Sequence, residues 1–97
     1  MLVLVCYDIG DVAGAGAERL RQVSQACLNY GVRVQYSVFE CRIDAVQWVT
    51  LKARLLQIHD GEKDSLRFYF MCEADARRAE MHGVRKAINP TGILVVD

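Results

Sequence analysis

The chain has 97 residues, of which 53% are hydrophobic and 25% are charged. A chain of this length forms one compact domain, 1–97, and leaves no room for a second. Twelve basic residues balance twelve acidic ones, which excludes a strong overall positive field but not a local basic patch. Because so small a domain covers its apolar surface poorly when it folds alone, we expect self-association.

No segment reaches the roughly 18 to 20 apolar residues of a membrane span, and the start MLVLVCYD lacks the basic lead and cleavage site of a secretion signal. We therefore expect a cytoplasmic protein. The four cysteines are widely separated, so neither a disulfide framework nor a zinc site is predicted. Each lies in an apolar run or stripe and is expected to be a small buried side chain: Cys6, Cys27, Cys41 and Cys72.

The start of the chain predicts a strand, a connection and a helix. Residues 2–7 form a continuous apolar run, typical of a strand covered on both faces, and the run ends at Asp8. The segment GDVAGAGA, residues 10–17, predicts a flexible connection, and it lacks the lysine of a nucleotide-binding loop. Apolar residues then recur at helical spacing from about residue 15 to 30. Gly31 is expected to end this helix in the left-handed conformation.

The stretch YGVRVQYSVFEC, residues 30–41, alternates as a strand does. One row of side chains is apolar and is expected to face the core. That row consists of Val32, Val34, Tyr36 and Val38. The opposite row holds Arg33, Gln35 and Ser37 until Phe39 interrupts it, and the alternation alone does not say what these side chains contact.

The second half of the chain predicts a helix and two further strands. Asp44, with Gln47 three residues on, resembles a capping box and starts a helix to about His59. This helix carries two apolar stripes, one more than a single sheet face is expected to cover. Alternation in residues 65–72 predicts a strand, the charged residues 73–86 allow a short helix, and residues 89–92 predict a turn before a last strand, ILVV.

This order of elements predicts an α+β sandwich with two helices on one face of a sheet. The ferredoxin-like βαββαβ arrangement fits if residues 32–42 fold into a hairpin, whose turn the periodicity alone does not place. The terminal ILVV is an extra C-terminal strand, and such a strand commonly adds to an exposed sheet edge, here that of a partner.

Asp8 is the candidate catalytic and metal-binding residue. A carboxylate at the end of a central strand stands where ligands often meet a sheet, although such residues also serve only as turn formers. Mg²⁺ takes oxygen ligands and commonly one or two protein carboxylates. A two-fold dimer that brings Asp8 against its symmetry mate would supply two.

Three arginines in the first half of the chain are candidates for contact with a partner or an ion. Arg19 and Arg21 lie two positions apart on the first helix, so they point about 200° apart and cannot form one tight fork. The alternative is that both are solvated and paired with Glu18 or with water. Arg33 lies on a strand, where an arginine tends to serve a partner or an ion pair.

Four segments together resemble the CRISPR-associated Cas-two family, the small subunit of the spacer-acquisition machinery. They are VCYDI, the Arg-x-Arg pair on the first helix, YGVRVQYSVFEC and DSLRFYFM. The match covers most of residues 1–71 in order, and YGxRVQxSVFE is its specific signature. The resemblance implies a ferredoxin-like fold with the hairpin turn near Gln35 to Ser37. It also implies a symmetric homodimer whose sheets face each other and whose C-terminal strands cross to the partner.

By position, the resemblance makes Asp8 the metal-binding aspartate. It assigns nucleic-acid contacts to Arg19, Arg21 and Arg33, and supporting roles to Tyr7, Ser37 and Phe39. One implied function is a Mg²⁺-dependent endonuclease that cleaves RNA or double-stranded DNA at a dimer interface, with Asp8 from each chain. The alternative is a non-catalytic scaffold that binds duplex DNA and bridges integrase dimers during spacer acquisition. A third option from the architecture alone, a ligand-sensing module, has no pocket motif to support it.

Overall fold

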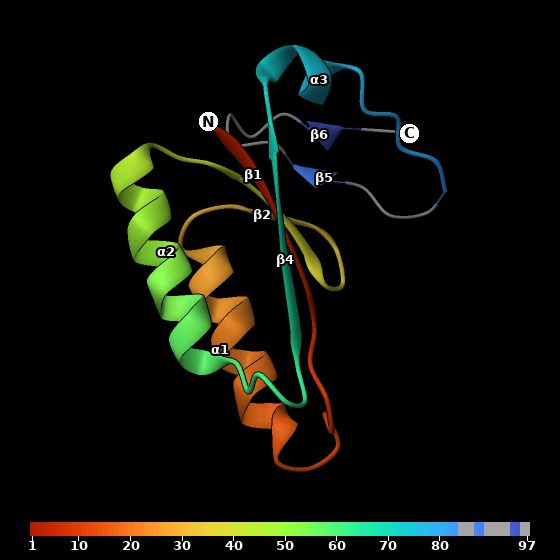
Figure 1. Ribbon diagram of the computed structural model, residues 1–97. Coiled ribbons are helices and arrows are strands. Elements are labelled where there is room, and N and C mark those ends of the chain that lie inside the picture. The colour runs from red at the N-terminus through yellow and green to blue at the C-terminus, as the bar shows by residue number, and fades with distance from the viewer. Residues whose placement is uncertain (84–86, 89–93, 96–97) are drawn as a thin grey trace.

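The structure is a computed structural model that describes residues 1–83, 87–88 and 94–95. Along the chain the elements are β1 (Leu2–Asp8), α1 (Gly16–Leu28), β2 (Val32–Gln35), β3 (Val38–Arg42), α2 (Ala45–Ile58), β4 (Ser65–Met71), α3 (Glu73–Arg77), β5 (Ala87–Ile88) and β6 (Leu94–Val95) (Figure 1). Among the described residues, no helix is long and apolar enough to cross a membrane.

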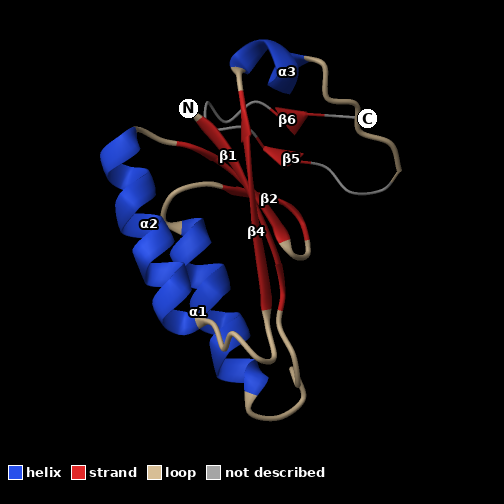
Figure 2. Ribbon diagram, viewed as in Figure 1, coloured by secondary structure: helices blue, strands red, loops and turns tan. Residues whose placement is uncertain are grey.

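The main sheet has four antiparallel strands in the order β2-β3-β1-β4. Helices α1 and α2 lie side by side on one face of this sheet, and the other face carries no helix along most of its length (Figure 2). The first six elements therefore form the predicted βαββαβ arrangement, and the α+β ferredoxin-like fold is confirmed. The hairpin turn lies at Tyr36 and Ser37, inside the segment where the family resemblance places it.

Strand β1 divides its side chains between the two faces of the sheet. Val3, Val5 and Tyr7 point toward the helices and are at most 5% exposed. Leu4, Cys6 and Asp8 alternate with them and so point to the face without helices. The central strand therefore ends with a carboxylate on that face, which we call the uncovered face.

The prediction for residues 30–41 is wrong about which row enters the core. Phe39 is fully buried beneath the helices, whereas Val38 pairs with Cys6 on the uncovered face. The strand pairing shifts register between Arg33 and Gln35, and the chain then turns, so one alternation does not run through the whole stretch. Phe39 is consequently a core residue and does not face a partner.

The segment after β1 is a hydrogen-bonded turn, not the loose connection predicted. Asp11 has a φ of 54°, and its carbonyl accepts from the backbone N–H groups of Gly14 at 3.0 Å and Gly16 at 2.8 Å. A Cβ atom at Gly16 would clash with the backbone of Gly10, so the start of α1 packs directly on this turn. Gly31 serves a similar close approach to β3, and its φ is not positive, contrary to the prediction.

Helix α2 shows both features predicted for it. Asp44 and Gln47 form the reciprocal capping box, with the Gln47 backbone N–H 2.7 Å from Asp44 Oδ1. One apolar stripe is buried against the sheet and consists of Trp48, Leu51, Leu55 and Ile58. The second stripe is left exposed, with Val46 at 76%, Val49 at 67% and Leu56 at 46%. A single sheet face therefore covers only one of the two stripes.

The four cysteines are free thiols in different surroundings. Cys27 and Cys41 are buried as predicted, and burial raises the pKa of the Cys27 thiol to about 12. Cys6 is half-buried. Cys72 is exposed, so the prediction is wrong for this residue, which caps the short helix α3 beyond the edge of the core.

The chain end forms a separate small sheet. Strands β5 and β6 pair with each other antiparallel, and β5 lies close to β2. The predicted last strand is present as Leu94–Val95, whereas β5 was not anticipated. The turn predicted at residues 89–92 lies outside the described residues. Crossing of this strand to a second chain stays a prediction.

Candidate functional site

Asp8 is the last residue of β1 and is exposed on the uncovered face. Its neighbour across the strand pair is Ser65, the first residue of β4. Within the described ranges, the Asp8 carboxylate makes neither a hydrogen bond nor an ion pair. It is therefore available to bind a cation from solvent.

A shallow hollow of about 300 Å³ lies beside Asp8. Its lining consists of Cys6, Tyr7, Asp8, Ser65, Arg67 and Tyr69. Arg67 pairs with Cys6 across the strands, and its Nη1 donates to the Tyr69 hydroxyl at 3.1 Å. This hydrogen bond raises the pKa of Arg67, which stays charged at any physiological pH.

Sequence reasoning missed the contribution of β4 to this site. The signal was present in DSLRFYFM, because the alternation that sends Leu66 and Phe68 toward the core sends Ser65, Arg67 and Tyr69 to the other face. Only the pairing of β4 with β1, however, shows that these residues flank Asp8. The order of the strands in the sheet is not visible in the alternation of one strand.

Tyr7 precedes Asp8 but points to the opposite face. Its hydroxyl lies 3.0 Å from Ser24 Oγ on α1 and donates to the Tyr36 carbonyl at 3.3 Å. Its backbone N–H donates to the Ser37 carbonyl at 3.1 Å. The Tyr7 side chain and the Ser37 backbone thus hold the end of β1 between the helix and the hairpin turn, and the Tyr7 side chain points away from Asp8.

Arg33 also lies on the helix-covered side of the sheet. Its guanidinium sits 5.1 Å from the centre of the Phe39 ring, a cation–π contact. Phe39 in turn stacks on Tyr7, with 6.2 Å between the ring centres. Because Arg33 pairs with Phe39 across the hairpin, it is separated from Asp8 by the sheet itself.

Arg19 is held by the buried carboxylate of Asp64. Nε lies 2.8 Å from Oδ2 and Nη2 lies 3.1 Å from Oδ1, while the Asp64 side chain is 0% exposed. Asp64 also accepts from the backbone N–H of Gly10 at 3.0 Å and of Asp60 at 2.8 Å. The guanidinium of Arg19 is the main cause that holds the pKa of Asp64 well below its usual range. The network fixes Gly10, two residues after Asp8.

Arg21 lies on the exposed side of α1. It pairs with Glu18, with Nε 3.0 Å from Oε2, and both side chains are at least 60% exposed. Hydrogen bonds from Arg21 and Gln22 lower the pKa of Glu18 to about 2. The alternative interpretation of a solvated helix arginine therefore describes Arg21, and the two helix arginines point to different partners.

The oxygen ligands on one chain fit part of a magnesium site. No group of three or more His, Cys, Asp or Glu side chains gathers anywhere in the described ranges. Asp8 supplies one unpaired, exposed carboxylate beside the Ser65 hydroxyl, which suits an ion that keeps waters and substrate oxygens as its other ligands. A second carboxylate would have to come from a second chain.

A sequence profile described as "CRISPR associated protein Cas2" matches residues 1–79. The chain is 47% identical over 96 residues to the "CRISPR-associated endoribonuclease Cas2" of Nitratidesulfovibrio vulgaris, which covers 99% of this chain and 94% of the relative. It is 45% identical over 89 residues to the "CRISPR-associated endonuclease Cas2" of Halalkalibacterium halodurans, over 92% and 93% of the two chains. A crystal structure of Streptococcus pyogenes Cas2 at pH 6.5 superposes with a TM-score of 0.78 and 47% identity, covering 86% of this chain and all of that one.

Proposed function

The chain belongs to the Cas2 family of CRISPR-associated proteins, and on this premise we propose that it is a Mg²⁺-dependent endonuclease that cleaves RNA or double-stranded DNA. The observation that carries the proposal is the Asp8 carboxylate, which is exposed and unpaired within the described ranges and lies beside a hollow on the uncovered face. The names of two relatives support the substrate class, since one is an endoribonuclease and the other an endonuclease.

In this proposal two chains form a homodimer through their uncovered faces, and Asp8 of each chain holds the ion. When bound, Mg²⁺ polarises the phosphate and makes hydroxide available from water at neutral pH. The residues behind Asp8 keep it in place: Tyr7 and Ser37 fix the end of β1, and Arg19 with Asp64 fixes the turn that follows.

The arginines named from the sequence divide in this proposal. Arg21 and Arg33 are exposed on the helix-covered side, so they bind phosphates only of a nucleic acid long enough to reach around the sheet. Arg19 acts mainly through Gly10, because four of its five N–H groups donate to Asp64 and to backbone carbonyls.

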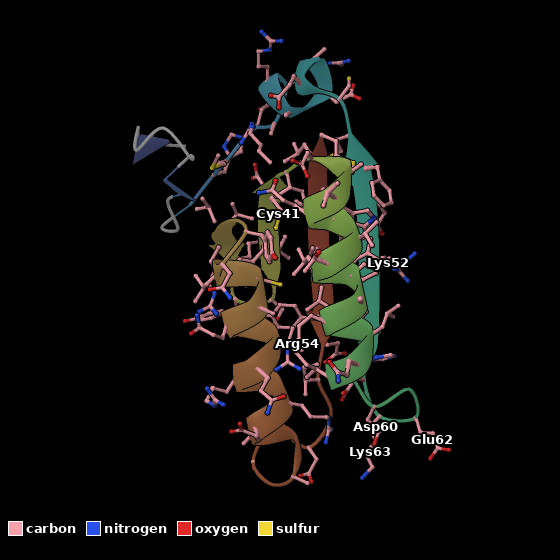
Figure 3. All side chains as sticks on the ribbon, turned by 90° about the vertical axis from the view of Figure 1, so that its left-hand side faces the viewer. Cys41, Lys52, Arg54, Asp60, Glu62 and Lys63 are labelled. Carbon is pink, nitrogen blue, oxygen red and sulfur yellow. The ribbon has the colours of Figure 1, made fainter. Side chains whose placement is uncertain are left out.

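The experiment compares Asp8→Asn with Glu62→Gln on end-labelled RNA and duplex DNA in the presence of Mg²⁺. Both substitutions remove one exposed carboxylate, but Glu62 lies in the turn between α2 and β4, and its side chain points outward from the molecule (Figure 3). Asp8→Asn should reduce the cleavage rate at least 100-fold, Glu62→Gln should not change it, and EDTA should stop the wild type. Equal cleavage by Asp8→Asn and the wild type would refute the proposal.

One observation favours a second candidate, the non-catalytic scaffold that binds duplex DNA and bridges CRISPR integrase dimers. The lining of the hollow includes no histidine, glutamate or second aspartate that could act as a general base beside Asp8. A scaffold predicts that spacer acquisition in cells survives Asp8→Asn. Loss of acquisition in parallel with loss of cleavage would exclude it.

A further inference from the structure

Asp8 shares its hollow with an arginine on the neighbouring strand. The register pairs Cys6 with Arg67 and Asp8 with Ser65, so Asp8 and Arg67 are diagonal neighbours on the uncovered face. Diagonal neighbours in an antiparallel pair have Cβ atoms about 7 Å apart, within reach of a long side chain. The hollow is thus bordered by one anion and one cation.

These two charges do not neutralise each other. In the part of the chain that the structure describes, Asp8 forms no ion pair, and the only hydrogen bond of the Arg67 guanidinium is to the Tyr69 hydroxyl. Three other arginines are paired with carboxylates, namely Arg19 with Asp64, Arg21 with Glu18 and Arg42 with Glu73. Within the described residues, the uncovered face therefore keeps a cation without a carboxylate partner beside an unpaired carboxylate.

The hydrogen bond to Tyr69 leaves one edge of the guanidinium open. Nη1 is used by the tyrosine, whereas Nε and Nη2 have no acceptor among the described residues. The Nε and Nη2 hydrogens form the fork that grips two oxygens of a phosphate or carboxylate. Tyr69 thus fixes the orientation of the arginine and leaves its fork for an anionic ligand.

We propose that Arg67 binds the non-bridging oxygens of a nucleic-acid phosphate in the hollow, with Tyr69 as its positioning residue. A phosphodiester with a bound divalent cation would match both charges of the hollow. Its cation would lie toward the Asp8 carboxylate, and its phosphate would lie toward the Arg67 guanidinium. The contact reads no base, so it is independent of sequence. The inference rests on the proposed function in placing nucleic acid beside Asp8.

A different occupant would be a carboxylate from a second copy of the chain. Glu40 of β3 lies on the same uncovered face, since it pairs with Leu4, and a facing sheet would bring such a group near Arg67. In that case Arg67 would stabilise the dimer and would not contact phosphate. The two occupants predict different results when Arg67 is removed. Loss of a dimer contact would lower the mass of the particle in solution, whereas loss of a phosphate contact would leave that mass unchanged.

The experiment measures binding in the Asp8→Asn background, so that no substrate is cleaved. Fluorescence anisotropy with a labelled RNA and a labelled DNA duplex gives the affinity between 50 and 300 mM salt, on the order of the range where phosphate contacts respond. Arg67→Gln should weaken binding about 10-fold and reduce the salt slope by about one for each Arg67 that contacts phosphate. Arg67→Lys should retain the slope but lose affinity, because lysine keeps the charge without the fork.

The matched control is Arg54→Gln, which removes the same charge from the opposite side of the sheet. Arg54 lies between α1 and α2 (Figure 3) and donates to Gln57. This variant should bind as the parent does, and light scattering should give every variant the parent's mass. An unchanged salt slope in Arg67→Gln, an equal loss in Arg54→Gln, or a fall in mass in Arg67→Gln would overturn the proposal. Cleavage by Asp8→Asn would refute the proposed function but would leave this binding result intact.

Discussion

The two faces of the main sheet differ in whether the polar side chains at the end of β1 have partners. On the helix-covered face, Tyr7 bonds Ser24, Arg33 lies on the Phe39 ring, and Asp64 at the end of the helices holds Arg19. On the uncovered face, the Asp8 carboxylate has no partner in the described part of the chain.

The contrast follows from burial. A polar group removed from water must find a partner within the protein, whereas an exposed group keeps its hydration and can stay unpaired. The buried pair of Asp64 with Arg19 is therefore explained by stability alone. Asp8 is exposed on the uncovered face, so its carboxylate needs no partner within the fold and is accessible to a ligand.

The largest effect on stability is expected from Phe39, which the family resemblance had placed toward a partner. Replacing it with alanine removes a fully buried ring between Tyr7 and Arg33. The free energy of unfolding should fall by about 4 kcal/mol. Urea denaturation followed by circular dichroism checks this value, and a loss below about 1 kcal/mol would show that Phe39 is not a core residue.

Asp64→Asn should have the next largest effect, about 3 kcal/mol, because it breaks an ion pair whose carboxylate is 0% exposed. The effect should depend on pH. The pKa of Asp64 is lowered in the folded protein from its ordinary value of 3.8, so the unfolded chain takes up the proton first as the pH falls. The stabilisation is therefore complete above about pH 5 and declines as the pH falls through 4 and below.

Measured from pH 7 to pH 2, the difference in unfolding free energy between the wild type and Asp64→Asn should shrink as the pH falls. Glu62→Gln serves as the control, because Glu62 is exposed and its removal should change neither the stability nor its acid dependence. A difference that stays constant down to pH 2 would mean that Asp64 is not an ionised partner of Arg19.

The smallest effect is expected on the outer stripe of α2. Val49 is 67% exposed, so Val49→Gln should change the free energy of unfolding by less than about 0.5 kcal/mol. Leu51→Ala, two residues further on and on the buried stripe, should cost about 3 kcal/mol in the same denaturation experiment. Similar losses for the two variants would show that the second stripe is covered in solution.

The fold was predictable from the sequence wherever a single helix or strand shows one uninterrupted spacing of apolar residues. The run before Asp8, the capping box at Asp44 and the alternation after residue 65 each marked a single strand or helix. The prediction for residues 30–41 was wrong because a turn and a shift in register interrupt the alternation. Local periodicity does not show which side chains of a hairpin face the helices.

The candidate site was predictable only in part. Asp8 stood out because a carboxylate ended an apolar run. Arg67 did not, because its importance depends on the pairing of β4 with β1, which joins residues 61 positions apart in the chain. Arg19 was predicted to bind nucleic acid, but it is paired with Asp64. Asp64 lies in a distant turn, and no local sequence pattern connects the two residues.

The most direct test of the contrast between the two faces is to measure cleavage and unfolding together for Asp8→Asn and Asp64→Asn. The substitution is the same, but Asp8 is an exposed carboxylate on the uncovered face and Asp64 is a buried carboxylate paired with Arg19. Asp8→Asn should abolish Mg²⁺-dependent cleavage of RNA or duplex DNA and leave the free energy of unfolding within about 0.5 kcal/mol of the wild type. Asp64→Asn should lower the free energy of unfolding by about 3 kcal/mol, and the molecules that remain folded should lose far less cleavage activity than Asp8→Asn does, because Asp64 positions Gly10 and does not hold the ion. If Asp8→Asn instead destabilises the fold and retains cleavage, the assignment of function to the uncovered face is wrong.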